Sequence, residues 1–407
     1  MNARAPRRDI RGPLWVGLMV MLAIPIPFKG LVMPERGAPI LYLIVAAALA
    51  LFWYIGRTSW PLGLLLLYTL AHVLVAGYPI RGVQLLLLMA LCGILYVEAA
   101  HLERPWAHRV AWAILAGAAL QGALGVLNMF HIFPGPTAAV LALRWIGVDP
   151  MPALRFFDSA PWLTLLSRDY LGRPMGWLTH PNYWGSLLAL AVPVAYVTLG
   201  RWAALVPFAL VGASLSIGPI VSASAGLAVV AWKDMPRVLR PALVASLLVV
   251  VVSVSVTHIT PRLGTDDRPR VRLETVTSGR TNVWAAAWPK VLEAPVFGNG
   301  VGSWRMWAGE YNRVTGTGFA TLQAHNEALQ LVFELGLVGL GIVLAWAVRL
   351  ARRVPVALAG GPEYLMWAGV LAVALVNSLG SPTFHLPTQA AIAFFATARL
   401  EAGARSS

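Results

Sequence analysis

The chain has 407 residues, of which 58% are hydrophobic and only 12% are charged. Because soluble globular domains carry about 25% charged residues, this composition excludes an ordinary soluble enzyme and indicates an integral membrane protein. The formal net charge of +14 would suit a nucleic-acid partner, but the basic residues follow membrane topology, which argues against one.

The pattern of apolar runs predicts twelve membrane-spanning helices, each about long enough to cross a bilayer. They cover residues 14–29, 39–56, 60–78, 81–98, 107–129, 178–199, 202–217, 219–232, 240–257, 327–349, 364–381 and 384–399. With the N-terminus in the cytoplasm, the inside loops and tails hold 16 of the 31 Lys and Arg residues, and the short outside loops hold 3. This positive-inside bias places both termini in the cytoplasm and both long loops outside.

These spans divide the chain into five segments. Residues 1–129 hold the first five spans, 130–177 form an outside or interfacial segment, 178–257 hold spans six to nine, 258–326 form a large outside loop, and 327–407 hold the last three spans and a short tail. The expected fold is all-α, with about 12 transmembrane helices and one large outside loop. Two short helices are predicted inside that loop, over 284–292 and 306–313.

The large outside loop carries two residues that could do chemistry. His325 begins a predicted helix that continues over 326–344, and Arg280 follows a glycine in a polar run. Histidine is the side chain best suited to take a proton near neutral pH, and arginine offers a planar fork of donors that fits phosphate oxygens. The alternatives are an interfacial histidine bonded to a backbone carbonyl and a solvated loop arginine.

A second basic cluster lies where the first long loop turns into a helix. It contains Arg173 and the run His180-Pro181-Asn182. Pro181 suits the first helical position, and a helix N-terminus there would favour an anion. The alternative is that the proline and asparagine only shape the start of the helix. Because both clusters lie on the predicted outside at helix starts, together they favour a single site.

Two acids follow His325 on the same predicted helix. Glu327 and Glu334 are seven residues apart and share one helix face, with Glu334 about 10 Å along it. An acid inside the membrane is a functional candidate, and the alternative is that Glu334 pairs with a buried polar group. His385, at the start of the last predicted span, stays ambiguous.

The motifs that the sequence lacks narrow the chemistry. It has no GxGxxG, GxxxxGK[ST], HExxH or CxxC motif, so the chemistry of soluble nucleotides is unsupported and any donor is expected to be membrane-borne. The single cysteine, Cys92, excludes an internal disulfide and a cysteine-based metal cluster.

Several patterns resemble the signature of a known family. They are Gly279-Arg280 with Trp284, Pro295-x-x-Gly298-x-Gly300-x-Gly302, His325-Asn326-x-x-Leu329, Glu334-Leu335-Gly336-Leu337-x-Gly339, and upstream Arg173-x-x-Gly176 with His180-Pro181-Asn182. This set is similar to the motifs of the O-antigen ligase and polymerase superfamily, closely over 172–341 and loosely over the rest of the chain. It does not separate O-antigen ligases from repeat-unit polymerases, protein O-oligosaccharyltransferases or proteins once described as bicarbonate transporters.

The resemblance implies a GT-C-like, metal-independent, inverting glycosyltransferase without a cofactor, in the bacterial inner membrane with a large periplasmic loop. The donor would be a glycan on undecaprenyl pyrophosphate. Arg280, and also Arg173, would bind the pyrophosphate, and His325 would orient or deprotonate the acceptor hydroxyl. The other residues expected to bind substrate are His180, Asn182, Asn326 and Glu327. Many relatives carry an arginine in the region corresponding to 221–226, and this chain has none there.

Three alternatives stay open beside a ligase that uses a lipid A–core acceptor. A polymerase would use the same donor with a second lipid-linked glycan as acceptor. A small-solute transporter would need ionisable residues near the bilayer midplane and discontinuous spans, whereas the polar residues here concentrate at the predicted outer boundary. A structural assembly partner would not need the Arg and His side chains.

Overall fold

The computed structural model of the chain describes residues 50–75, 79–130, 181–232, 280–315, 323–359 and 361–406. Every regular element in these ranges is a helix, so the prediction of an all-α fold is confirmed there. The helices are α3 (Trp60–Val75), α4 (Pro79–His101), α5 (Arg104–Met129), α9 (Pro181–Leu199), α10 (Leu205–Ala213), α11 (Ile217–Ala231), α14 (Arg280–Glu293), α15 (Ser303–Thr315), α16 (Glu327–Ala359), α17 (Pro362–Ser378), the 3-10 turn η1 (Thr383–His385) and α18 (Pro387–Ser406).

Four helical stretches are long and apolar enough to cross a membrane. They are Gly82–His101, Arg104–Met129, Pro181–Leu199 and Glu327–Pro355. Two apolar helices, Trp60–Val73 and Ile217–Ala231, are shorter. The total of twelve spans stays a prediction, because 14–29, 240–257 and most of 39–56 lie outside the described residues. α10 has nine residues, which is shorter than the predicted span 202–217.

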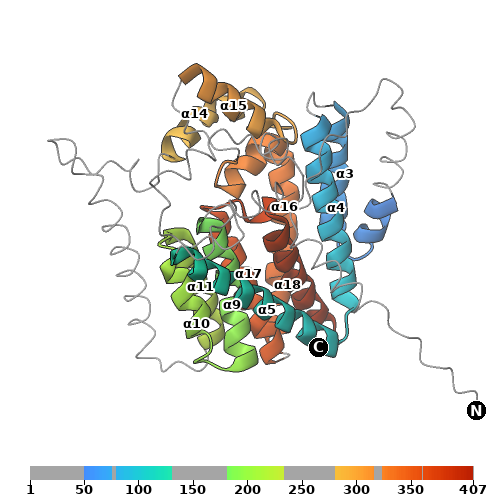
Figure 1. The fold of residues 1–407 in the computed structure, drawn as a ribbon. Coiled ribbons are helices and arrows are strands. Elements are labelled where there is room, and N and C mark those ends of the chain that lie inside the picture. The colour runs from blue at the N-terminus through green and yellow to red at the C-terminus, as the bar shows by residue number, and fades with distance from the viewer. Residues whose placement is uncertain are drawn as a thin grey trace, which may run out of the picture.

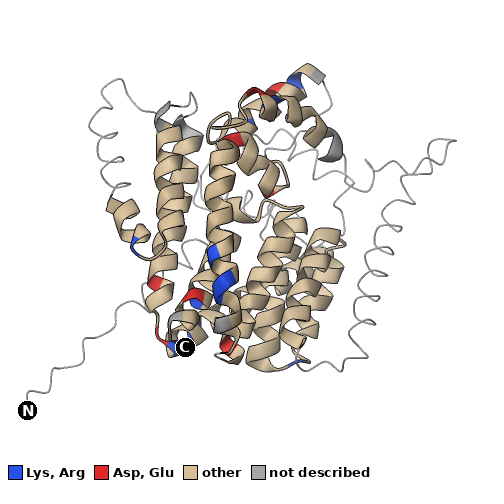
Figure 2. Ribbon diagram, turned by 180° about the vertical axis from the view of Figure 1, so that it is seen from behind, with Lys and Arg blue, Asp and Glu red and all other residues tan. Residues whose placement is uncertain are grey.

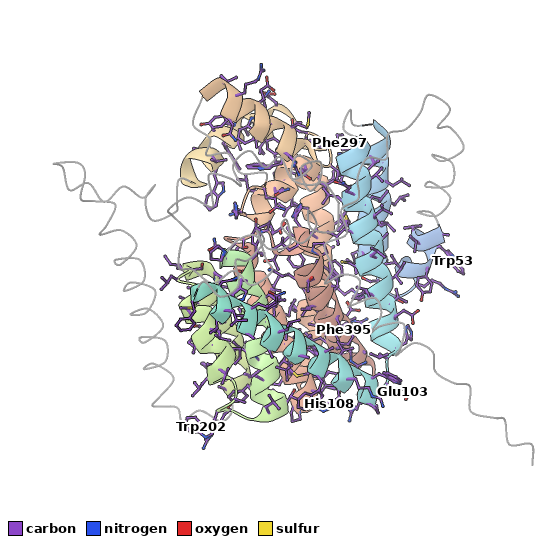
Figure 3. The ribbon with its side chains drawn as sticks, in the orientation of Figure 1. Trp53, Glu103, His108, Trp202, Phe297 and Phe395 are labelled. Carbon is purple, nitrogen blue, oxygen red and sulfur yellow. The ribbon has the colours of Figure 1, made fainter. Side chains whose placement is uncertain are left out.

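The bundle has two distinct ends. The short helices α14 and α15 lie together at one end of it, beyond the long helices (Figure 1). We call this the motif end and define it by the starts of α9, α14 and α16. At the other end, the opposite end, α16 and α18 finish. Phe297 lies near the motif end, whereas Glu103, His108 and Trp202 lie near the opposite end (Figure 3).

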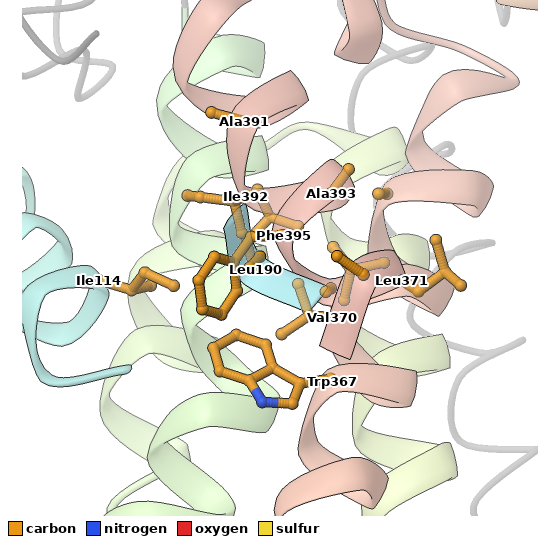
Figure 4. Close-up of a cluster of buried hydrophobic side chains, with 14 of the residues drawn as sticks. Ile114, Leu190, Trp367, Val370, Leu371, Ala391, Ile392, Ala393 and Phe395 are labelled. Carbon is orange, nitrogen blue, oxygen red and sulfur yellow. The ribbon is translucent and has the colours of Figure 1, made fainter. Parts of the chain in front are cut away.

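Large aromatic and aliphatic side chains fill the centre of the bundle. Trp367 of α17 and Phe395 of α18 meet edge to face, with ring centroids 4.9 Å apart, beside Leu190 of α9 (Figure 4). α11 and α17 pack closely because each has a glycine at the contact. A Cβ on Gly226 would lie 3.0 Å from the carbonyl oxygen of Gly369. Small residues at such contacts are typical of membrane helices.

α16 is broken near its start, so the prediction of a continuous helix over 326–344 is wrong at Gly336. This residue has φ 64° and ψ −165°, which interrupts the helical ladder. Inside a membrane, backbone groups freed by a break need partners from the protein. The loop 295–302 supplies them. The bonds are Leu337 N to Pro295 O (2.9 Å), Val338 N to Val296 O (3.1 Å), Asn299 N to Phe333 O (2.8 Å) and Gly300 N to Glu334 O (3.0 Å).

Two glycines make this contact possible. A Cβ on Gly298 would lie 2.5 Å from the amide nitrogen of Gly336, and a Cβ on Gly336 would lie 2.4 Å from the oxygen of Val296. Both glycines have positive φ, which side-chain-bearing residues rarely adopt. From α3, the Tyr68 hydroxyl donates to the carbonyl of Leu335 at 3.0 Å. The glycine pattern of 295–302 therefore holds the break in α16.

Candidate functional site

His325 lies in the turn 323–326 that leads into α16. Its backbone is left-handed, with φ 53°, and the residue is only 7% exposed. Leu215 is the other non-glycine residue with positive φ in the described part of the chain. Such a conformation costs free energy, persists only where the surroundings hold it, and clusters at functional sites. The backbone thus singles out the histidine that the sequence predicts to be catalytic.

Three side chains hold this turn in place. The Trp284 indole donates to the carbonyl of Ala324 at 2.7 Å. The amide N–H of Ala324 donates to the side-chain oxygen of Gln330 at 3.1 Å. Asn326 accepts a bond from the amide of Leu329 at 3.0 Å, as an N-cap residue does. The side chain of Asn326 is therefore used inside the protein, and its predicted contact with substrate stays a prediction.

α14 brings the second predicted catalytic residue to the same place. Arg280 is the first residue of α14, and Trp284, one turn later, bonds to Ala324 beside His325. The start of α14 is thus fastened to the turn that holds His325. The side chain of Arg280 lies outside the description.

The start of α9 also reaches this turn. The Tyr183 hydroxyl lies 3.4 Å from the side-chain oxygen of Gln323, and Gln389 of α18 donates to the Tyr183 carbonyl at 3.2 Å. One residue earlier, Asn182 accepts a bond from the Ser216 hydroxyl at 2.5 Å. The two sequence regions predicted to form one site therefore approach each other at Tyr183 and Gln323. Arg173 and His180 lie outside the described residues, so their roles stay predictions.

A buried polar chain runs behind His325. His385 Nδ1 lies 2.8 Å from a Glu327 carboxylate oxygen, and the other oxygen accepts the amide N–H of Phe384 at 2.8 Å. Gln330 Nε2 lies 3.0 Å from His385 Nε2 and donates to Glu334 at 3.1 Å. Glu327 is thus occupied by internal partners, and its predicted contact with substrate stays a prediction. The pairing of Glu334 with a buried polar group is confirmed.

Sequence reasoning missed Gln330 and left His385 open. Residues 327, 330 and 334 share one face of α16 by their spacing of three and four, which was the available signal for Gln330. The partner of Glu327 comes from η1, 58 residues further along the chain. No pattern in the local sequence predicts a contact between residues so far apart in the chain.

His385 lies in η1, outside the helices that could span a membrane. Burial lowers its pKa, but the charges of Glu327 and Glu334 raise it more, to about 9. Within the described ranges, no three His, Cys, Asp or Glu residues gather as metal ligands would.

A comparison with known families agrees with the motifs. Residues 202–344 match the family model described as O-antigen ligase (Wzy_C). The matched region holds α14, α15, the His325 turn and the break in α16. No curated protein matches the chain. The match confirms, over these residues, the resemblance of the motifs to the O-antigen ligase and polymerase superfamily.

Proposed function

We propose that the protein is a glycosyltransferase of the bacterial inner membrane that moves a glycan from undecaprenyl pyrophosphate to a lipid A–core sugar. The observation that carries the proposal is the buried, left-handed His325 at the meeting point of three helix starts. The family match supports a lipid-linked glycan as substrate.

The helix starts suit a pyrophosphate. α9, α14 and α16 begin at the motif end, and hydrogen bonds join the first two to the turn before the third. A helix N-terminus presents free N–H groups and a partial positive charge, which favour anions. Arg280 begins α14 and adds a full positive charge that stays protonated. Arg173 is proposed as a second phosphate ligand.

His325 and Arg280 divide the reaction between them. His325 takes the proton of the acceptor hydroxyl as its oxygen forms a bond to the anomeric carbon of the donor sugar. The bond between that carbon and the phosphate oxygen breaks, and the pyrophosphate keeps the electron pair. Arg280 stabilises the charge that develops on this leaving group. A single displacement of this kind inverts the anomeric centre and needs no metal.

The distribution of charge supports a periplasmic site. Among the described residues, acidic and basic positions lie on α14 and α15 at one end of the bundle and in its other half (Figure 2). The opposite end holds several arginines, including Arg349, Arg353 and Arg399, and basic residues mark the cytoplasmic side of membrane proteins. The motif end would then face the periplasm, with both chain termini in the cytoplasm.

The test is transfer by the purified protein. Wild-type protein in detergent or liposomes receives an undecaprenyl-pyrophosphate-linked glycan together with lipid A–core. We expect glycan on lipid A–core. Product that stays on undecaprenyl pyrophosphate would identify a polymerase instead. Failure to transfer to either acceptor, by protein shown to be folded, would contradict the proposed enzyme.

A further inference from the structure

The hydrogen bonds of Gln330 fix which way its amide points. The backbone N–H of Ala324 can only donate, so the Gln330 atom 3.1 Å from it must be the oxygen. The amide nitrogen therefore faces the other way, toward His385 and Glu334. The reverse orientation would set two donors against each other at Ala324.

This orientation fixes the tautomer of His385. Its Nε2 receives an N–H from Gln330 at 3.0 Å, so that nitrogen carries no proton. The ring proton is then on Nδ1, which faces the Glu327 carboxylate at 2.8 Å. A proton on Nε2 would face the Gln330 amide donor and push it away.

We propose that Gln330 and His385 are positioning residues that hold the His325 turn only while Nε2 of His385 is unprotonated. In that state the side-chain oxygen of Gln330 accepts the hydrogen bond from the Ala324 N–H, and this bond holds the left-handed backbone of His325 in place. When Nε2 takes a proton, the Gln330 amide turns its oxygen to the new donor and leaves Ala324. The functional part of this inference rests on the proposed role of His325 as the base.

The surroundings of His385 allow both states. Glu327 and Glu334, both from α16, are the charged groups that act on it, and within the described residues α17, η1 and α18 add none. The two carboxylates favour the charged ring, whereas the bond from Gln330 favours the neutral ring. Raising the pH removes the proton from Nε2 of His385 and should therefore strengthen the hydrogen bond between Gln330 and the Ala324 N–H.

The experiment measures kcat and KM for the lipid-linked donor across pH, using purified full-length protein. Gln330→Met removes all three hydrogen bonds of this side chain at similar volume, and we expect kcat to fall about 10- to 100-fold with little change in KM, as for a misplaced catalytic group. Above the pH range in which the base His325 itself loses its proton, wild-type kcat should rise further toward pH 9, and this further rise should be absent in His385→Gln, which cannot take the proton. Thr397→Val, which removes a buried hydroxyl bonded within α18, is the matched control and should behave as wild type.

Gln330→Glu tests the proton directly. A carboxylate at this position can still accept from Ala324, but it can bond to His385 only when Nε2 carries a proton. Its kcat should therefore fall as the pH rises, opposite to wild type. A pH profile that runs in the wild-type direction would contradict the assigned tautomer.

A second readout separates this inference from the proposed function. Hydrogen–deuterium exchange of the segment 323–326 measures how strongly the Ala324 N–H is hydrogen-bonded, and it needs no catalytic turnover. We expect faster exchange in Gln330→Met than in wild type and in Thr397→Val. Unchanged exchange, or wild-type kcat in Gln330→Met, would overturn the inference even if transfer is active. Absent transfer with faster exchange would instead contradict the proposed function alone.

Discussion

The two ends of the bundle use the same helices in different ways. At the motif end, α16 and the segment before α18 contribute a strained turn, a helix break and a chain of hydrogen-bonded side chains. At the opposite end, α16 and α18 contribute arginines paired with carboxylates. The buried carboxylate Glu401 at the opposite end is paired with arginines, whereas the strained turn at the motif end is held by surrounding hydrogen bonds. From this difference we expect substitutions at the motif end to affect the proposed reaction and substitutions at the opposite end to affect stability.

Each ion pair of the opposite end has one deeply buried member and one partly exposed member. Glu401 is fully buried and lies 3.3 Å from Arg349 and 3.6 Å from Arg353. Arg399, 3% exposed, lies 2.8 Å from Glu363 of α17. Removing the partner of the buried member leaves an unpaired buried charge, which is strongly destabilising. These residues join α16, α17 and α18 and have no part in the proposed reaction.

The largest expected effect is on activity, from His325→Asn. Asparagine tolerates a left-handed backbone but cannot act as a general base, so the transfer rate should fall about 10²- to 10⁴-fold while the melting temperature stays near wild type. The measurement is product formed per folded molecule. Leu215→Asn, at the other left-handed residue, is the control and should keep full activity. Equal loss in both variants would mean that the strain alone, and not the imidazole, matters.

At the opposite end, Glu401→Gln should cost stability and spare activity. Arg349 and Arg353 lose their countercharge, and because both keep some contact with solvent, we expect a loss of about 1–3 kcal/mol in the free energy of unfolding. Denaturant or thermal melting in detergent checks this, with transfer measured on the surviving folded fraction. A large fall in activity per folded molecule would contradict the claim that the opposite end contributes to stability and not to activity.

The helix break can be tested with Gly298→Ala. The added Cβ meets backbone atoms of Glu334 and Gly336 at 2.5 Å, at a residue with φ 78°. A left-handed residue costs about 1–2 kcal/mol and overpacking about 1–3 kcal/mol, so the variant should melt well below wild type. Gly341→Ala on α16 meets no atom within 4 Å and is the control. A matching melting temperature in the two variants would contradict the tight contact.

A further expected effect is the dependence of stability on pH. Because the pKa of His385 is raised to about 9 from about 6.5 in an unfolded chain, its contribution to stability is fully present below pH 6.5 and is lost as the pH rises through 9. The melting temperature of wild type should therefore fall over this window, while kcat rises. His385→Gln should lack this component of the fall. A melting temperature that depends on pH equally in both proteins would exclude His385 as its source.

The sequence predicted the helical class and most helix bounds because apolar runs of membrane length are a strong local signal. α3, α4, α5, α9, α11 and α17 each begin and end within a few residues of the predicted span. The break at Gly336 escaped prediction because its cause is a loop 34 or more residues earlier that packs against it. An apolar run has the same sequence pattern whether its helix is continuous or is interrupted and hydrogen-bonded to a neighbouring loop.

The site shows the same limit. His325, Arg280 and Asn182 could be proposed from residue type and from motifs, and the structure brings the segments around them together. The hydrogen bonds that Gln330 makes to Ala324 and His385 could not be predicted, because they depend on contacts between α16 and η1 and on the orientation of one amide. Long-range contacts of single side chains leave no periodic trace in a sequence.

The most direct test of the account compares His325→Asn and Glu401→Gln in one assay, with melting temperature and transfer from an undecaprenyl-pyrophosphate-linked glycan measured on the same samples. We predict that His325→Asn keeps its melting temperature and loses transfer, whereas Glu401→Gln loses stability and keeps transfer per folded molecule. Near-normal transfer by folded His325→Asn would contradict the central claim that the motif end carries the chemistry.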